Sequence, residues 1–309
     1  MMMSNKQQNL KLDHISVCIC TYKRPELLSR ALFGVTSQST KSAFSYEVIV
    51  VDNDCHRSAE EIVRLFQPGK AVKIIYDCEP AQNIALTRNK AILNATGNFI
   101  AFIDDDEIPA EDWLYKMYQC IKDYNADAVL GPVLPYFPNG APSWLKKSGL
   151  CDRPRNVTGS PITRRDMRTG NILFQRYIFA KDDMWFNPSR GLTGGEDAEF
   201  ISGQLKKGRK FVWCEEAVVY ETVSEERWLA SFYLKRNFRI GTSNGQSIRR
   251  SRSYGEALKT LLIFNCYAAL LPFSMLTGKH IWIKILTKVY FNAGCILSFL
   301  KFKNVKQIE

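Results

Sequence analysis

The stretch NFIAFIDDDEIP, residues 98–109, places a short apolar run directly before four acids, Asp104 to Glu107, and then a proline. The apolar run predicts a buried strand that ends at the acids. Crowded carboxylates repel one another, and a carboxylate in a low-dielectric site shifts its pKa or needs a cation. The acids therefore form either a solvated turn that begins a helix or a site for something positive.

Three further strands are predicted before this one, at HISVCICTY (14–22), YEVIVVDND (46–54) and AVKIIYD (71–77). Helical patterns separate them: Pro25 opens one helix, and QNIALTRNKAILNATG (82–97) forms another, which Gly97 is expected to end. Alternating strands and helices predict an α/β fold, in which a Rossmann-like, mostly parallel sheet is flanked by helices.

Polar residues follow the first, second and fourth predicted strands. They are Thr21-Tyr22-Lys23-Arg24, Asp52-Asn53-Asp54 and Asp104-Asp105-Asp106. Ligands in open α/β sheets bind outside the carboxyl ends of the strands. We therefore expect the three polar groups to line one crevice.

Residues 131–170 are rich in proline, glycine and basic residues and show little periodicity, which is typical of a functional loop or a mobile one. Regular structure returns with NILFQR (171–176). A helix is then expected from about Glu196, followed by a strand and by a basic helical pattern, EERWLASFYLKRNFRIG (225–241).

The net charge of +11 is concentrated near the end of the chain. Residues 1–200 carry 24 Lys and Arg and 24 Asp and Glu, whereas residues 201–309 carry 18 basic and 7 acidic residues. The same region is strongly apolar, because residues 257–276 are long and apolar enough to cross a bilayer. This combination favours contact with an anionic membrane surface over nucleic-acid binding, for which basic residues gather on a polar face with exposed aromatics.

A second apolar segment, residues 281–300, places five polar or small side chains on one helical face: Lys284, Thr287, Lys288, Asn292 and Cys295. That stripe fits a helix in the membrane interface, one that spans beside a neighbour, or one of two helices packed on the globular domain. The N-terminal residues have no apolar core typical of a secretory signal, and the nine cysteines show no metal-ligand spacing. We expect reduced thiols and the cytoplasmic face of the plasma membrane.

Several motifs together resemble a known family. They are SVCICTYKRPELL, VIVVDND, LTRN, GNFIAFIDDDEIPAEDWL and TGGEDAEF. In this order the motifs resemble those of the inverting family 2 glycosyltransferases, which have the GT-A fold. RTGNILF and KRNFRIGTSNGQ are similar to stretches of the succinoglycan-type exopolysaccharide β-1,4-glucosyltransferases.

The resemblance implies a site for a nucleotide sugar. Asp104 and Asp106 match the family's D-x-D pair, so Asp106 is expected to bind Mg²⁺ or Mn²⁺ directly and Asp104 to lie near the ribose or the metal. Taken without the other motifs, these acids could equally form the N-terminal turn of a helix, where acidic side chains favour the helix dipole. The resemblance and the strand ends place these residues at the donor: Thr21, Tyr22, Arg24, Asp52, Asn53, Arg88, Asp104 and Asp105.

The resemblance also assigns catalysis. Asp197 matches the Asp of the family's ED pair and is the expected base, with Glu196 shaping the acceptor site. Lys235, Arg236 and Arg239 share a helical face that contacts either a diphosphate or acceptor, or only solvent. Many relatives have a histidine near the metal, after the ED helix. Here Tyr220 and Glu221 stand in that region, and a histidine ligand is in doubt.

The expected function is metal-assisted transfer of a sugar, with glucose expected, from a UDP-sugar to a lipid-linked saccharide in exopolysaccharide or surface polysaccharide synthesis. The alternatives are a polyprenyl-phosphate sugar transferase and a non-catalytic membrane scaffold. The chain is expected to divide into four parts: an N-terminal tail (1–13), a nucleotide-sugar-binding half (14–130), an acceptor-binding and catalytic-base half (131–245), and basic, hydrophobic membrane-associating helices (246–309).

Overall fold

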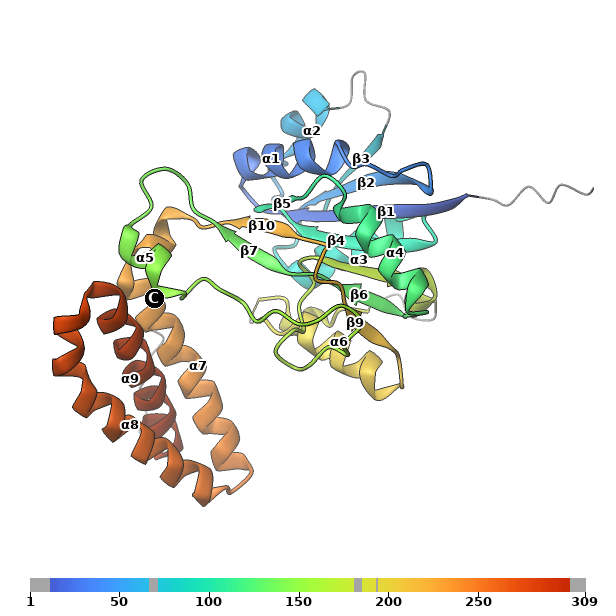
Figure 1. Ribbon diagram of the computed structural model, residues 1–309. Coiled ribbons are helices and arrows are strands. Elements are labelled where there is room, and N and C mark those ends of the chain that lie inside the picture. Colours follow the sequence, from blue (N-terminus) through green and yellow to red (C-terminus); the bar gives the residue numbers. More distant parts are fainter. Residues whose placement is uncertain (1–11, 67–71, 181–184, 193, 301–309) are drawn as a thin grey trace, which may run out of the picture. The chain divides into compact units, whose positions relative to one another are not determined.

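The computed structural model describes residues 12–66, 72–180, 185–192 and 194–300 (Figure 1). Its chain forms two compact units. Unit 1 comprises Met1–Leu134 and Arg153–Glu221, and unit 2 comprises Pro135–Asp152 and Thr222–Glu309. Each unit is therefore built from two separate stretches of sequence.

A seven-stranded sheet forms the centre of unit 1, in the order β3-β2-β1-β4-β8-β6-β9. Its strands are β1 (Asp13–Thr21), β2 (Phe44–Asp52), β3 (Lys73–Cys78), β4 (Phe99–Asp104), β6 (Ala128–Leu130), β8 (Ile172–Gln175) and β9 (Phe211–Trp213). The strands β1 to β4 are parallel, β8 is antiparallel to β4 and β6, and β9 is parallel to β6. The predicted α/β class with a mostly parallel sheet is confirmed.

Helices pack on both faces of this sheet. They are α1 (Pro25–Thr36), α2 (Glu60–Phe66), α3 (Ile84–Asn94), α4 (Trp113–Asp123) and α6 (Glu196–Lys206), with short 3-10 turns at Arg176–Phe179 and Pro188–Arg190. Side chains of α1, α2 and α4 join one buried cluster, and those of α3 and α6 join another. Along β1, Val17 and Ile19 enter the first cluster and Cys18 the second, as the two-residue period of a strand requires.

The helix predicted over 82–97 ends earlier than expected. In the structure α3 stops at Asn94 with Ala95 as its C-cap, so the prediction that Gly97 ends the helix is wrong. A Cβ on Gly97 would lie 2.6 Å from the carbonyl oxygen of His14 and 2.7 Å from the amide nitrogen of Ser16. The glycine allows the backbone before β4 to approach β1 closely.

A three-stranded sheet, in the order β5-β10-β7, contains β5 (Glu107–Pro109), β7 (Val133–Tyr136) and β10 (Val219–Thr222). β5 pairs antiparallel with β10, which places Glu221 opposite Glu107. Asp104, Asp105 and Asp106 thus lie at the end of β4 and in the turn before β5, rather than in the first turn of α4, which begins at Trp113.

Unit 2 is helical. It contains α5 (Ser143–Ser148), a 3-10 turn (Glu225–Trp228), α7 (Ala230–Arg250), α8 (Tyr254–Ser274), a second 3-10 turn (Met275–Thr277) and α9 (Lys279–Phe299). α9 packs along both α7 and α8. Its small core includes Trp144 and Leu145 of α5, Tyr233 of α7 and Ile283 of α9.

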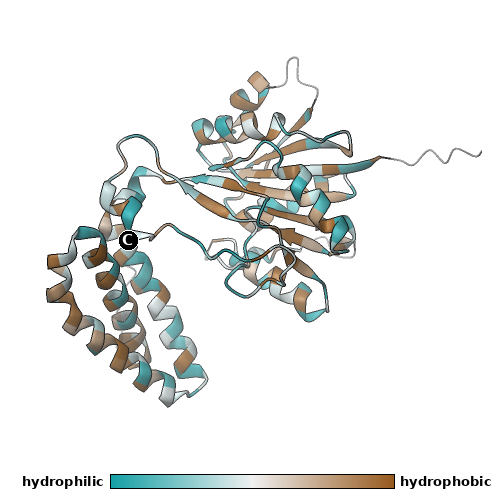
Figure 2. Ribbon diagram, viewed as in Figure 1, coloured by the Kyte–Doolittle hydropathy of each residue, from teal (hydrophilic) through white to brown (hydrophobic). Residues whose placement is uncertain are grey.

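The two apolar segments predicted near the end of the chain correspond to α8 and α9. Among the described helices, the stretch Tyr254–Thr277 is the one that is long and apolar enough to cross a membrane (Figure 2). The polar stripe predicted on residues 281–300 is divided, because Thr287, Asn292 and Cys295 are buried while Lys284 and Lys288 are exposed. α9 therefore turns its small polar groups inward and its lysines outward.

Candidate active site

A cavity of about 410 Å³ lies in unit 1 at the carboxyl ends of the central strands. Its lining residues are Cys20, Thr21, Tyr22, Arg24, Asn53, Gln82, Asn83, Ile84, Asp104, Asp105, Asp106, Gly191, Leu192 and Glu221. The three strand ends that the sequence singled out, after β1, β2 and β4, thus contribute to one pocket. It is the location expected for a ligand in an open α/β sheet.

Asp105 has hydrogen-bond partners within the protein. Its carboxylate is buried and accepts hydrogen bonds from Thr21 Oγ1 (2.8 Å) and Arg24 Nη1 (3.2 Å). Arg24 Nη1 also lies 3.5 Å from Asp106 Oδ2. The half-exposed Arg24 therefore rests on the acidic turn and ties the start of α1 to it.

The neighbouring carboxylates have less compensation. Burial raises the pKa of Asp106 to about 7, with further increases from Asp104, Glu221 and Asp105, and Arg24 opposes the shift. Glu107 is buried, and its Oε2 accepts the Asp104 N–H at 3.1 Å. Its Oε1 has no hydrogen-bond partner among the described residues. This excess of buried negative charge fits a hard divalent cation, which prefers oxygen ligands.

Gly170 lies against the same carboxylates. A Cβ at this position would be 2.7 Å from Asp104 Oδ2 and 2.8 Å from Glu107 Oε1. A side chain would therefore displace the two acids. The glycine of the RTGN motif lets the chain before β8 pass directly behind Asp104.

Glu221 is a cavity residue that was not among the predicted site residues. It lies on β10, lines the pocket and forms an ion pair with Arg153, whose Nη2 is 2.6 Å from its Oε1. One signal in the sequence could have identified it, because Glu221 stands in the region after the ED helix where many relatives have a histidine near the metal. The structure puts a carboxylate beside the acidic turn in that region.

Asp52 lies beneath the pocket rather than in its lining. Its fully buried carboxylate accepts the N–H groups of Asp54 (2.9 Å) and Ala59 (2.7 Å) and the Tyr76 hydroxyl (3.2 Å). These bonds hold the turn after β2. In this structure the contribution of Asp52 is to fix that turn, which presents Asn53 to the cavity.

Asn53 organises the loop before α3, which also lines the cavity. Its Nδ2 donates to the carbonyls of Glu79 (2.9 Å) and Ala81 (2.6 Å), and its Oδ1 accepts the Asn83 N–H (2.8 Å). Asn83 caps α3 by accepting the Ala85 and Leu86 N–H groups. An asparagine before a helical pattern is a strong N-cap signal, so the position of Asn83 was readable from the sequence.

Three predicted site residues, Arg88 on α3 and Glu196 and Asp197 at the start of α6, are not among the residues that line the cavity. Arg88 and Glu196 are both buried and form a short ion pair through Arg88 Nη1 and Glu196 Oε1. Glu196 Oε2 has no partner among the described residues. Arg88 is not part of the cavity lining, but Asp104, Glu196 and Asp197 all help to raise its pKa against the effect of burial. It is a buried cation shared by the acidic turn and the ED pair.

Asp197 is half-buried in the first turn of α6, where its Oδ1 accepts the Ala198 N–H at 2.7 Å. Burial raises the pKa of its carboxyl, and Arg88 limits the increase. Gly194 and Gly195 precede the helix with φ of 79° and 94°, a conformation that glycine adopts without strain. Gly194 and Gly195 therefore form a sharp turn directly before two acids at a helix N-terminus.

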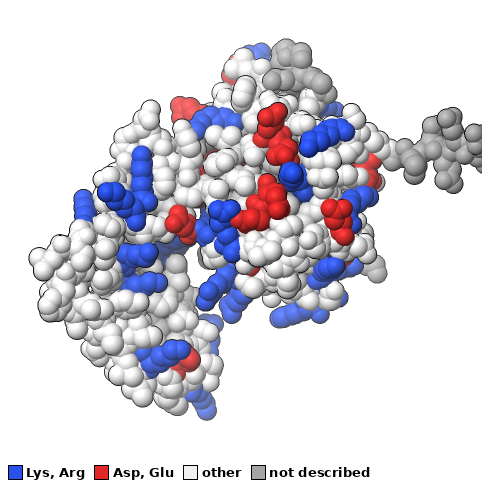
Figure 3. Space-filling view, in the orientation of Figure 1, with Lys and Arg blue, Asp and Glu red and all other residues white. Residues whose placement is uncertain are grey.

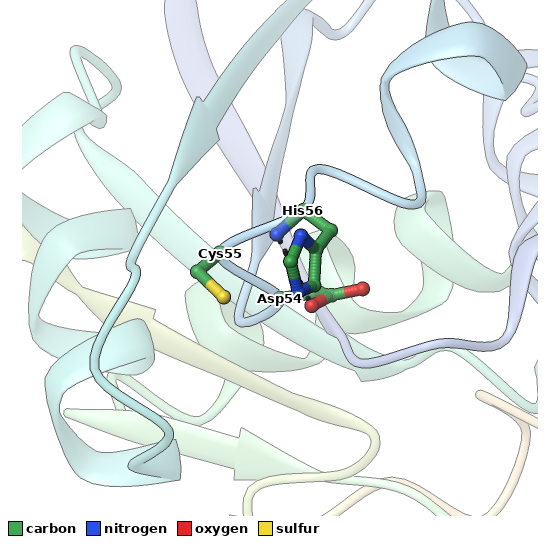
Figure 4. Close-up of side chains that lie close together, drawn as sticks. All are labelled: Asp54, Cys55 and His56. Atoms are coloured by element: carbon green, nitrogen blue, oxygen red, sulfur yellow. Dashed lines mark hydrogen bonds between the residues drawn. The ribbon is translucent and has the colours of Figure 1, made fainter.

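Lys235, Arg236 and Arg239, expected at a diphosphate or acceptor, are exposed on α7 of unit 2. A separate group in unit 1, Asp54, Cys55 and His56, brings three potential metal-ligand atoms within 4.8 Å of one another (Figure 4). The three residues are consecutive, and the His56 N–H donates to Asp54 Oδ1 at 3.2 Å. The turn after β2 accounts for their proximity.

Comparison with known proteins gives consistent results. Residues 16–182 match the family described as Glycosyl transferase family 2. The succinoglycan biosynthesis protein ExoM of Rhizobium meliloti is 31% identical over 303 residues, which cover 95% of each chain. A crystal structure of S. aureus TarS 1-349 in complex with UDP-GlcNAc has a TM-score of 0.52 at 16% identity, covering 92% of this chain and 91% of that one.

A second solved structure, GalNAc-T7 with UDP, GalNAc and Mn²⁺, has a TM-score of 0.54 at 16% identity. It covers 72% of this chain and 46% of that one. At such low sequence identities the two solved structures show similarity of fold alone. The fold that they share with this chain is GT-A.

Proposed function

The chain belongs to glycosyltransferase family 2, and from that premise we propose that it transfers a sugar, with inversion, from a UDP-sugar to a lipid-linked saccharide. The observation that carries the proposal is the cavity at three strand ends, where the carboxylates of Asp104, Asp106 and Glu221 gather and burial raises the pKa of Asp106 to about 7. TarS and GalNAc-T7, which share the fold, have been crystallised with UDP-GlcNAc and with UDP and Mn²⁺. ExoM is named as a succinoglycan biosynthesis protein.

Thr21, Tyr22 and Asn53 are proposed to hold the nucleoside, because they line the cavity beside the acidic turn. Asp106, with Asp104 and Glu221 next to it, would hold Mg²⁺ or Mn²⁺. When bound, the cation neutralises charge on the diphosphate as it departs. Arg24, which already contacts Asp105 and Asp106, is placed to interact with phosphate oxygens at the same edge.

Asp197 is proposed as the general base. The acceptor oxygen forms a bond to the anomeric carbon, the bond from that carbon to the diphosphate oxygen breaks, and the acceptor proton passes to Asp197. Its pKa, raised by burial, makes the carboxylate a better proton acceptor than a solvated aspartate. Arg88 and Glu196 hold the start of α6 in position through their buried ion pair.

The acceptor is proposed to be lipid-linked and to be met at the cytoplasmic face of the plasma membrane. Unit 2 carries 16 Lys and Arg against 5 Asp and Glu, while unit 1 carries 26 of each. The whole net charge of +11 therefore belongs to the unit that also contains the apolar α8. Lys235, Arg236 and Arg239 would contact a lipid pyrophosphate. Glucose is the proposed sugar because RTGNILF and KRNFRIGTSNGQ resemble stretches of the succinoglycan-type β-1,4-glucosyltransferases.

The parts of the chain are assigned accordingly. We assign donor binding to residues 14–130, acceptor binding and the base to residues 131–245, and membrane association to residues 246–309. Glu221 lies within residues 131–245, so we propose that this part of the chain also contributes to the metal site.

The test is sugar transfer by membrane fractions. Wild type, Asp106→Asn and Asp112→Asn are incubated with each of a panel of UDP-sugars and Mg²⁺ or Mn²⁺, with and without native lipid extract. Asp112 is the matched control, because it lies outside the cavity at the N-cap of α4. We expect lipid-dependent transfer from one donor by wild type and by Asp112→Asn. EDTA should abolish this transfer, and Asp106→Asn should show none.

Other results would redirect the assignment. Transfer to a simple polyprenyl phosphate as efficiently as to the extract would replace the saccharide acceptor. Binding of UDP without transfer to any component of a lipid extract that supports the pathway would favour a non-catalytic scaffold. Full activity of Asp106→Asn would refute the proposed metal site.

A further inference from the structure

We infer that α8 lies flat in the surface of an anionic bilayer, with α7 and α9 behind it, and does not cross the membrane. The inference deepens the membrane attachment of the proposed function and rests on it. Three features of unit 2 carry it: the apolar surface of α8, the distribution of basic residues and the packing of α9.

α8 presents its apolar side chains to the outside. Leu258, Leu262 and Phe273 are 59%, 58% and 69% exposed, and of the residues in this helix only Thr260 and Ser274 are buried. Figure 2 shows α8 as mostly hydrophobic and α7 as mostly hydrophilic. Apolar exposure along a whole helix marks a surface that is covered by another apolar phase or partner.

The charges select the occupant of this surface. On the face drawn in Figure 3, the charged side chains of unit 2 are mostly Lys and Arg. Exposed basic residues flank α8 at both ends, with Arg250 and Arg252 before it and Lys279 after it. Anionic lipid headgroups complement these charges, whereas a second copy of the same unit would bring like charges together.

The two flanks also argue against a crossing helix. A spanning helix normally has its Lys and Arg concentrated on the cytoplasmic side. In unit 2, Arg250 and Arg252 at one end of α8 and Lys279, Lys284 and Lys288 beyond the other would require strong positive charge on both sides of the membrane. A helix in the interface places both ends at the same headgroup layer.

The packing of α9 against α7 also argues against a crossing. A Cβ on Gly241 of α7 would lie 1.9 Å from the Phe291 carbonyl oxygen, and one on Gly245 would lie 2.1 Å from that of Cys295. On α9, a Cβ on Gly294 would lie 2.4 Å from the Phe238 carbonyl oxygen of α7. The two backbones are thus in contact over several turns.

Because α9 packs on α8 as well, insertion of α8 across a bilayer would draw α9 and then α7 into the hydrocarbon. α7 carries the exposed side chains of Lys235, Arg236, Arg239 and Arg250, which are costly there. Lying flat, α8 meets the lipid while these basic residues stay in water or at headgroups. The geometry of unit 2 is therefore that of a surface helix with a supporting layer.

Cysteine accessibility distinguishes the two arrangements. Arg252→Cys and Lys279→Cys flank α8, and each is placed singly in a chain whose exposed Cys55 and Cys266 are serine. Intact spheroplasts of a bacterial host that expresses each variant are treated with a membrane-impermeant maleimide. We expect the protein in the membrane pellet, neither cysteine labelled until lysis, and release of the protein by alkaline carbonate. Labelling at one end in intact spheroplasts, or resistance to carbonate, would overturn the inference.

Vesicle binding tests the lipid. The purified full chain should bind vesicles containing about 30% phosphatidylglycerol at least tenfold more tightly than vesicles of phosphatidylcholine alone. Leu262→Glu should lose at least tenfold in affinity for the anionic vesicles. The control is Leu65→Glu, because Leu65 is 66% exposed on α2 in unit 1, and this variant should bind as wild type.

UDP binding and helix content by circular dichroism are measured in the same samples. UDP binding that persists while vesicle binding fails overturns this inference and leaves the donor site of the proposed function intact. Loss of UDP binding with vesicle binding retained does the reverse. A chain that ignores vesicles and dimerises through α8 in sedimentation experiments also overturns the inference.

Discussion

At the scale of single residues, the pKa of Asp197 governs the pH dependence of the proposed reaction. Burial raises this pKa above the ordinary aspartate value, so the base becomes protonated and activity is lost at a higher pH than for a solvated carboxyl. We predict that Asp197→Asn lowers kcat by about 10² to 10⁴ and removes the acidic limb of the kcat profile.

Steady-state kinetics between pH 4 and 9 measure both effects. Glu199→Gln is the control, because Glu199 is exposed on the same helix and its carboxylate accepts hydrogen bonds from Asn187 and Arg190. A variant at Asp197 that keeps an unchanged kcat and pH profile would assign the base to another residue.

The buried Arg88–Glu196 ion pair is expected to contribute to the stability of unit 1. Arg88→Met leaves the carboxylate of Glu196 buried without its cation, which should lower the free energy of unfolding of unit 1 by about 3–5 kcal/mol. Adding Glu196→Gln removes the unpaired charge, so the double variant should recover most of the loss. Urea unfolding without nucleotide or metal is measured for wild type, Arg88→Met, Glu196→Gln and the double variant, and these four values give the coupling energy. Additive losses in the double variant would show that the pair is not the source.

At the scale of elements, the glycines between α7 and α9 are expected to be intolerant of any side chain. Gly241→Ala would place a methyl group 1.9 Å from a carbonyl oxygen and force the helices apart, at about 1–3 kcal/mol or more. Gly255→Ala on α8 meets no atom within 4 Å and should be neutral or slightly stabilising. Thermal unfolding followed by circular dichroism in mild detergent compares them. Equal melting temperatures would mean that the α7–α9 contact contributes little to unit 2.

The sequence predicted the elements whose signal is local. Strands β1, β2 and β4 and their polar ends follow from continuous apolar runs, and the acids 104–106 entered the cavity as expected. Gly97 was misread because a helix-ending glycine and a glycine at a close backbone contact look alike in sequence. The latter becomes visible only when β1 is in place.

Several residues reach the site through contacts between distant parts of the chain. Glu221 reaches the acidic turn because β10 pairs with β5, more than 100 residues earlier in the chain. Leu192 lines the cavity through the loop before α6, and Arg88 turned toward Glu196 on a different helix. No periodicity encodes contacts of this kind, since they depend on where whole elements pack.

At the scale of the whole molecule, the two units differ in charge and composition and are expected to unfold separately. Calorimetry should show two transitions, as in other proteins with more than one unit. UDP with Mn²⁺ at about 100 times its Kd should stabilise the transition of unit 1 by about 2.7 kcal/mol and leave that of unit 2 unchanged. Anionic vesicles should act on unit 2 alone. A single transition that both ligands shift would contradict this independence.

The small core of unit 2 has a consequence for synthesis. Trp144 and Leu145 of α5 are made early, but Ile283 of α9, which completes their cluster, follows roughly 140 residues later. At about 5–20 residues per second, the ribosome needs roughly 7–28 s to reach it. During that interval the indole and leucine side chains lack their final neighbours, although every strand of unit 1 has been translated before α7 begins. The nascent chain thus offers a timed apolar site to chaperones or to the membrane before its last helices exist.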